Sequence, residues 1–127
     1  MRISKKTEYG LTAMVHLAKN ENGKVSSIRE ISNIEGVPFE FLSKIFVCLE
    51  KAKIVEAKHG ANGGYALAKS PKNITVSDIV SLLEKMKVVE CGPCVKSKKC
   101  LTKNVWSRVD GAISKTLKSI TLADLIK

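Results

Sequence analysis

The sequence has no apolar stretch long enough to cross a membrane and no recognisable export signal. None of its uninterrupted apolar runs approaches the roughly 20 residues that a membrane-spanning helix needs. Residues 1–8 are mostly polar or charged and lack the apolar core of a signal peptide. We therefore expect a cytoplasmic protein with no membrane partner. In that reducing compartment, cysteines are more often metal ligands or redox groups than disulfides.

Acidic residues are scarce relative to basic ones. The 127 residues include 22 Lys and Arg but only 12 Asp and Glu, which gives a formal net charge of +10. Positive charge concentrated on a small body attracts polyanions, either nucleic acid or an anionic membrane surface, and of the two the charge and length favour nucleic acid as the partner. The sequence shows no internal repeat or low-complexity segment, and an apolar content of 44% is sufficient for a folded core.

Apolar residues at helical spacing predict three helices in the first half of the chain. The first runs from Lys5 to Lys19, where apolar positions follow the i, i+3, i+4, i+7 spacing of a helix with one buried face. A short second helix can be capped by Ser26 or Ser27, and Gly36 suits its end because glycine tolerates a positive φ. A third, amphipathic helix covers about residues 38–52. Two helices joined by a tight turn that contains glycine predict a helix-turn-helix.

A β-hairpin is predicted directly after these helices. Residues 54–58 and 65–67 have the pattern of short strands around the glycine-rich sequence from His59 to Gly64. A hairpin that follows a helix-turn-helix is typical of a wing. Thr75 can then cap a fourth helix that extends to about Lys85.

The rest of the chain divides into a cysteine-rich stretch and a long helix. Residues 87–100 show no helical pattern and contain three of the four cysteines. From Leu101 to Ile120 apolar residues recur at about every fourth position, which predicts a helix of about 20 residues and ~30 Å. Thr121 can cap a last turn through Leu125. A helix of this length favours a projecting dimerisation helix, and the alternative is a helix folded back on its own domain.

The exposed face at the start of the third helix is the candidate DNA-reading surface. In the major groove, Glu40 can accept from a cytosine amino group, and Lys44 can contact a guanine edge or a phosphate. The alternative for each residue is an ordinary solvated helix face. The other expected DNA-binding residues lie on this helix, near the N-terminus, before the second helix and in the wing: Arg2, Lys5, Ser27, Ser43, Lys58 and His59.

Three cysteines within ten residues are the most specific feature of the sequence. Cys91, Cys94 and Cys100 lie in a stretch that Gly92 and Pro93 can bend. Thiolates must converge to bind zinc or an iron–sulfur cluster, and a short bent loop brings them together with little ordering. The alternatives are unligated surface thiols, or a redox dithiol like that of thioredoxin, although this chain lacks the alternating strand–helix pattern of that fold. The remaining cysteine falls inside the third helix and is expected to pack as a small core residue.

The predicted fold is mainly α with a minor β component. It is a winged helix-turn-helix with a two-stranded wing and a long C-terminal dimerisation helix. We assign residues 1–86 to the DNA-binding domain, 87–100 to a cysteine-rich, cluster-binding loop, and 101–127 to the dimerisation helix and C-terminal turn. The three parts are expected to form a single compact unit overall.

Together these features resemble the IscR/NsrR-type family of winged-helix regulators over nearly the whole chain. The resemblance is carried by the opening sequence MRISKKTEY, by Gly63-Gly64-Tyr65, and by Cys100-Leu101-Thr102 with Trp106 and the later sequence ITL. It implies a homodimer with crossed long helices and a palindromic operator in double-stranded DNA. It also implies an iron–sulfur cluster held by the three clustered cysteines.

The chain departs from the family pattern at the fourth ligand and in the wing. Lys103 stands where the cluster regulators place a histidine ligand, and a protonated lysine is a poor ligand. The nitric-oxide-sensing branch instead uses an acidic residue from the first helix of the partner subunit, and Glu8 stands at that position. The resemblance therefore makes Glu8 of the partner subunit the preferred fourth ligand, with Glu90 or an exogenous thiol as alternatives. In the wing, His59 and its neighbours replace a common Arg-Gly-Pro.

The combined prediction is a transcriptional regulator, expected to be a repressor and not an enzyme. It senses iron–sulfur status, redox state or nitric oxide through a labile cluster, with 2Fe–2S favoured over 4Fe–4S and zinc as the alternative metal. Two other functions stay open: a redox protein that uses the Cys-Gly-Pro-Cys dithiol, and a zinc-stabilised DNA-binding protein without a sensing role. In the leading hypothesis, cluster ligation orders the 87–100 loop and sets the spacing of two recognition helices.

Overall fold

The structure is a computed structural model that describes residues 3–20, 24–84 and 102–127. Within these ranges the chain forms six α-helices, one 3-10 helix and a two-stranded antiparallel sheet. In chain order the elements are α1 (Lys5–Ala18), α2 (Ile28–Glu35), α3 (Phe39–Lys51), β1 (Val55–Lys58), β2 (Gly64–Leu67), η1 (Pro71–Asn73), α4 (Val76–Leu83), α5 (Lys103–Lys118) and α6 (Leu122–Leu125). The predicted winged helix-turn-helix is therefore confirmed. The expected boundaries between residues 86 and 87 and between 100 and 101 lie outside the described residues.

The hydrophobic core lies where α1, α3 and α4 meet. Phe46 and Leu42 of α3, Met14 of α1 and Ile79 of α4 are fully buried there. Leu122 of α6 is also fully buried, so the C-terminal turn packs into the same core. The predicted apolar stripes of α1, α3 and α4 thus face a common centre, and burial of these side chains supplies the main stabilising free energy.

The stripe on α1 is only partly buried. Met14 and Ala18 lie in the core, whereas Leu11 and Val15 are half-buried at its edge. These two residues border a groove between α1 and α6. The prediction of a single continuous buried face on this helix was therefore too simple, because part of that face borders the groove.

Local capping explains where several elements begin and end. Ser27, not Ser26, caps α2, since its side chain accepts a hydrogen bond from the Glu30 amide at 3.0 Å. Gly36 ends this helix with a φ of 70°, in the left-handed region that glycine tolerates. Thr75 and Thr121 form complete capping boxes at the starts of α4 and α6.

The wing is joined to the helix-turn-helix through backbone hydrogen bonds at its root. In the sheet Val55 pairs with Leu67, and Lys58 pairs with Gly64. Beyond the sheet, the Ser26 amide donates to the Tyr65 carbonyl at 3.0 Å, and the Tyr65 amide donates back to the Ser26 carbonyl at 2.8 Å. The hairpin is therefore fixed to the residues that lead into α2.

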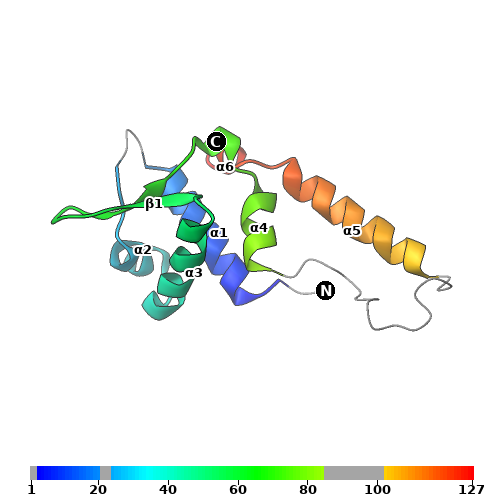
Figure 1. The fold of residues 1–127 in the computed structure, drawn as a ribbon, viewed down its shortest axis with the longest axis horizontal. Coiled ribbons are helices and arrows are strands. Elements are labelled where there is room, and N and C mark those ends of the chain that lie inside the picture. Colours follow the sequence, from blue (N-terminus) through cyan, green and yellow to red (C-terminus); the bar gives the residue numbers. More distant parts are fainter. Residues whose placement is uncertain (1–2, 21–23, 85–101) are drawn as a thin grey trace.

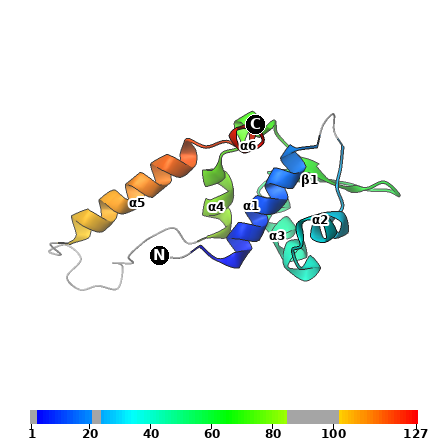
Figure 2. The same cartoon turned by 180° about the vertical axis from the view of Figure 1, so that it is seen from behind.

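The long helix α5 extends away from the rest of the protein. Figures 1 and 2 show α2, α3 and the wing at one end of the molecule and α5 at the other. The helix has 16 residues, fewer than expected, because it begins at Lys103 and ends at Lys118. Val105 and Trp106 are 52% and 38% exposed, so this part of the helix does not fold back onto its own domain. Among the described helices, none combines the length and apolar content that a bilayer crossing requires.

Candidate functional site

The start of α3 presents the side chains that the sequence selected for DNA contact. Glu40 and Lys44 are exposed, and Ser43 is half-buried. The Ser43 hydroxyl donates to the Phe39 carbonyl at 3.1 Å, which leaves its oxygen able to accept a further hydrogen bond. These residues lie in the first turns of α3, opposite the side chains that enter the core. They can contact base edges or phosphates without disturbing the packing.

The other expected DNA-binding residues are spread over three elements. Lys58 and His59 are exposed where β1 leads into the tip of the wing. Ser27 is half-buried, and its hydroxyl oxygen already caps α2. Lys5 is exposed on α1 and forms an ion pair with Glu8 at 3.2 Å. Arg2 lies outside the described residues.

One contact between the two helices of the helix-turn-helix was not predicted. The guanidinium carbon of Arg29, in α2, lies 4.5 Å from the centre of the Phe39 ring, in α3. Nearby, Phe41 makes an edge-to-face contact with Tyr9 of α1, with ring centres 5.2 Å apart. Neither contact follows from helical periodicity, because each joins residues of different elements.

The proposed cluster ligands Cys91, Cys94 and Cys100 lie outside the described residues. Cys48 is half-buried and packs against the core, as expected of a structural cysteine. In the three described ranges, no group of three or more His, Cys, Asp or Glu side chains is arranged to hold a metal ion. A described side chain can therefore contribute to a metal site only together with the cysteine-rich stretch or a second chain.

The end of α4, just before the cysteine-rich stretch, is tied to the first turn of α1. One carboxylate oxygen of Glu84 accepts from the Ser4 amide and from the Thr7 hydroxyl, both at 2.8 Å. Thr7 is 2% exposed, so this hydrogen bond is largely shielded from water. The next residue of α1 is Glu8, the proposed fourth ligand. Its side chain is 53% exposed, and its ion pair with Lys5 is also exposed.

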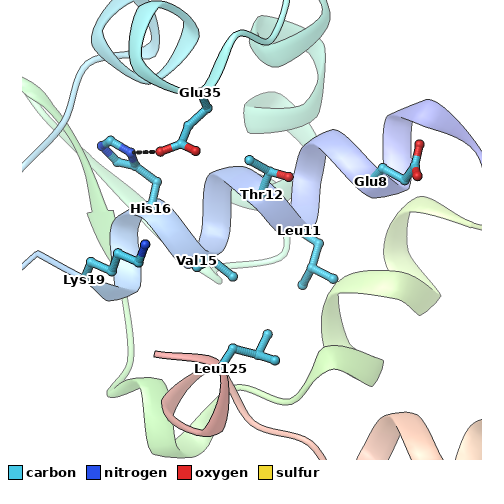
Figure 3. A pocket seen from close by; sticks show the side chains of 8 residues that line it. All are labelled: Glu8, Leu11, Thr12, Val15, His16, Lys19, Glu35 and Leu125. Carbon is cyan, nitrogen blue, oxygen red and sulfur yellow. Dashed lines mark hydrogen bonds and ion pairs between the residues drawn. The ribbon is translucent and has the colours of Figure 1, made fainter. Parts of the chain in front are cut away.

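Glu8 also lies at one end of a groove along α1. The groove has a volume of about 500 Å³. Figure 3 shows Leu11 and Val15 of α1 facing Leu125 of α6 across it, with the charged side chains toward its ends. Its full lining consists of Glu8, Leu11, Thr12, Val15, His16, Lys19, Glu35 and Leu125.

At the opposite end of the groove, a histidine links three parts of the helix-turn-helix. His16 Nδ1 lies 2.8 Å from Glu35 Oε2 of α2, and its Nε2 lies 3.3 Å from the Ser26 hydroxyl. Asn20 donates to the same hydroxyl at 2.9 Å. This role was not predicted, because His16 is an isolated histidine in the sequence. Its side chain connects α1 to α2 and to the residue that anchors the wing.

The wing root is anchored by an aromatic contact. The Tyr65 ring lies 4.7 Å from that of Phe46, between centres. Burial first, and then the charge of Glu50, raises the pKa of the Tyr65 hydroxyl above its ordinary value of 10.0. Tyr65 therefore remains neutral at physiological pH and acts as a packing residue.

Known proteins resemble this chain in both sequence and fold. Residues 3–127 match the family model for Rrf2, described as an iron-dependent transcriptional regulator. The protein rrf2 of Nitratidesulfovibrio vulgaris is 32% identical over 132 aligned residues, which cover 100% of this chain and 88% of that protein.

Two solved structures illustrate the likeness of the fold. CymR, the global cysteine regulator of B. subtilis, superposes with a TM-score of 0.85 at 33% identity, covering 99% of this chain and 96% of that one. IscR of T. potens superposes with a TM-score of 0.84 at 34% identity, covering 99% of this chain and 86% of that one.

Proposed function

Because the chain belongs to the Rrf2 family of iron-dependent transcriptional regulators, we propose that an iron–sulfur cluster held by Cys91, Cys94 and Cys100 controls its binding to DNA. Its family and its winged helix-turn-helix make it a DNA-binding regulator and not an enzyme. The observation that carries the proposal is the placement of three cysteines within ten residues between α4 and α5. We propose further that it represses transcription and that the cluster senses iron–sulfur status, redox state or nitric oxide.

The cysteine spacing, and not the likeness to solved structures, favours a cluster regulator over another kind of sensor. CymR, named a cysteine regulator, and IscR resemble this chain almost equally, with TM-scores of 0.85 and 0.84. The cysteine spacing supports the cluster, since thiolates are the usual ligands of iron–sulfur centres. We favour a 2Fe–2S cluster over 4Fe–4S.

The described residues are compatible with a cluster beside the first turns of α1. Glu8 carries an exposed carboxylate whose ion pair with Lys5 is solvated, and such pairs contribute little to stability. Breaking this ion pair so that the Glu8 carboxylate can bind a metal would therefore cost little free energy. We propose that Glu8 of the partner subunit completes the ligand set, and a bound cluster would supply redox-active iron.

We propose that the protein forms a homodimer through α5. Gly111 and the charged residues near it mark one exposed face of the helix, whereas Val105, Val109 and Ala112 form an apolar stripe on another. A second copy would cover this stripe and remove it from water. The dimer would place two copies of α3 on successive major grooves of a palindromic operator, about 34 Å apart.

In this dimer, α3 would enter the major groove and the wing would follow the adjacent backbone or minor groove. Glu40, Ser43 and Lys44 are the proposed base-reading residues. The proposed contacts outside α3 are Arg2, Lys5, Ser27, Lys58 and His59. The net charge of +10 would draw the protein to DNA whatever the sequence, and the residues of α3 would select the site.

The position of the cysteines suggests how ligation would change DNA affinity. The helix α4 packs on α1 and α3, and the proposed dimer helix α5 begins after the cysteine-rich stretch. Ligation by three cysteines would restrict how α5 is oriented relative to the helix-turn-helix. In a symmetric dimer that restriction fixes the separation of the two α3 helices.

Anaerobic purification tests the proposal directly. We expect a coloured protein with iron and sulfide in equal amounts and visible absorption bands. Replacing Cys91, Cys94 or Cys100 with serine should abolish these bands and change DNA affinity, whereas Cys48→Ser should retain both. A colourless protein that contains zinc would contradict the cluster and support a structural metal. Equal DNA affinity with and without the cluster would contradict its sensing role.

Mixed dimers test the source of the fourth ligand. In a dimer of one Glu8→Ala chain and one Cys91→Ser chain, the only complete cysteine set lies on the Glu8→Ala chain. If Glu8 comes from the partner, this dimer should carry one cluster with the native spectrum. If Glu8 acts within its own chain, or not at all, the spectrum should match that of the Glu8→Ala homodimer. Glu30→Ala, at an exposed glutamate of α2, is the control.

A further inference from the structure

Arg29 and Phe39 form an exposed pair across the two helices of the helix-turn-helix. Arg29 is the second residue of α2, Phe39 is the first residue of α3, and the guanidinium carbon lies 4.5 Å from the ring centre. Phe39 is 38% exposed and Arg29 is exposed as well. The pair therefore lies on the surface where α3 begins, beside the proposed base-reading residues.

Stacking on the ring restricts the guanidinium without using its hydrogen-bond donors. A cation over an aromatic face is held by the ring quadrupole, and the five N–H groups at the edge of the guanidinium stay available. In the described part of the chain, no carboxylate forms an ion pair with Arg29: Glu8 pairs with Lys5, and Glu35 lies 2.8 Å from His16 Nδ1. The result is an oriented, unneutralised positive charge.

The exposed phenyl ring is otherwise difficult to explain. Phe41, which is equally exposed, packs against Tyr9 of α1. The aromatic contact that the structure gives Phe39 is with Arg29 alone among the described residues. The Phe39 ring, exposed at the start of α3, can hold the Arg29 guanidinium in place.

We propose that Arg29 binds a DNA backbone phosphate at the edge of the major groove that α3 enters, and that Phe39 positions it. In helix-turn-helix proteins the first helix crosses the DNA backbone while the second enters the groove, which places α2 beside phosphates. A guanidinium can bind two phosphate oxygens in parallel, and a lysine cannot reproduce this geometry. This inference rests on the docking of α3 proposed above.

The test uses a DNA duplex that the wild-type protein selects from a random-sequence pool, together with its single base-pair variants. For Arg29→Ala we expect affinity to fall about tenfold per half-site. The loss should be equal on every base-pair variant, and the slope of log K against log salt should decrease by roughly one per half-site. Arg29→Lys should restore the slope but not the full affinity. The matched control is Lys72→Ala, which removes an exposed positive charge from η1.

Phe39→Leu separates positioning from direct contact. This variant keeps an apolar side chain but removes the aromatic face, so it should weaken binding in the same sequence-independent way. Combined with Arg29→Ala it should cause no further loss, because both changes remove one interaction. An additive loss would contradict the positioning role of Phe39.

Other outcomes would overturn the proposal. Unchanged affinity of Arg29→Ala would remove the phosphate contact. A loss confined to variants at one base pair would instead show that Arg29 reads a base. Failure of the wild-type protein to enrich any duplex would contradict DNA binding itself and is distinguishable from both results.

Discussion

Thr121 and Asp124 show how single side chains hold the C-terminal turn in place. The Thr121 amide donates to the Asp124 carboxylate at 3.0 Å, and the Asp124 amide donates to the Thr121 hydroxyl at 3.2 Å. The neighbouring Leu122 is fully buried, and its amide donates to the Ile74 carbonyl at 2.9 Å. These bonds place Leu125 on one wall of the α1 groove.

The hydrogen bonds predict how this turn responds to acid. Hydrogen bonds from the Thr121 backbone and then from its side chain lower the pKa of Asp124 below its ordinary value of 3.8. Because the pKa is lower in the folded state, the carboxylate stabilises the fold at higher pH. That contribution is lost as the pH falls below 3.8 and through the lowered value.

Substitution of Thr121 makes the effect measurable. Thr121→Val removes the hydroxyl but keeps the shape, so the pKa of Asp124 should rise toward its ordinary value in an NMR titration. Thr121→Ser retains the hydroxyl and should leave the titration nearly unchanged. An Asp124 pKa that is the same in Thr121→Val and wild type would show that the side-chain bond has no influence on it.

Residue-scale prediction from the sequence succeeds for local features and fails for distant partners. Thr75, Thr121 and Gly36 were identified because capping depends on residues within one turn of the chain. The pairing of His16 with Glu35 joins residues 19 positions apart on two helices. No periodic signal encodes such a pair, so only the packed structure reveals it.

At the scale of elements, the wing depends on a close approach of two backbones. A Cβ atom added to Gly64 would lie 2.6 Å from the Ser26 carbonyl carbon and 2.9 Å from the Ser27 nitrogen. These are backbone atoms of the segment that caps α2, and they cannot rotate away. The glycine therefore lets β2 pair with Ser26 and fixes the hairpin relative to the helix-turn-helix.

Gly64→Ala should displace the wing. We expect a loss of about 1–3 kcal/mol in the free energy of unfolding, typical of overpacking, and weaker DNA binding. Denaturant unfolding and duplex titration measure the two effects. Gly111→Ala is the control, since nothing lies within 4 Å of its added Cβ and alanine favours a helix. Equal stability of Gly64→Ala and wild type would show that the backbones separate without cost.

The types of element were predictable, but some of their ends were not. Amphipathic periodicity identified α1, α3 and α5, because apolar residues lie along one face of each helix. The fourth helix was expected to reach Lys85, yet it ends at Leu83. There Glu84 adopts an extended conformation (φ −130°, ψ 149°) and accepts hydrogen bonds from Ser4 and Thr7. This contact with the other end of the sequence competes with helix continuation. The three clustered cysteines were found from spacing alone, and their geometry lies outside the described residues.

At the scale of the whole molecule, the proposed DNA-reading surface and the proposed dimer helix lie at opposite ends (Figure 1). The helix α4 lies between them, in contact with α1, α3 and α5. A change in the orientation of α5 would therefore reach α3 through a packed element and not through a long loop. In a dimer, a small rotation at this junction changes the separation of two distant recognition helices.

The exposed stripe of α5 provides the last prediction. Val105→Glu should leave the monomer folded, because this side chain is 52% exposed and glutamate favours a helix. In a dimer that buries the stripe, each chain would bring an unpaired charge into the interface. We expect the dimer dissociation constant to increase at least about a hundredfold, since an uncompensated buried charge costs roughly 3–5 kcal/mol. Analytical ultracentrifugation measures this constant.

Asn104→Glu introduces the same charge at the adjacent position, on the polar face of α5, and so controls for charge and for proximity to the cysteine-rich stretch. It should remain dimeric and keep its affinity for a duplex with two half-sites, whereas Val105→Glu should bind such a duplex no better than one with a single half-site. If both variants stay dimeric, the apolar stripe of α5 is not the interface. The groove along α1, where Leu11 and Val15 remain half-buried, would then be the surface to test.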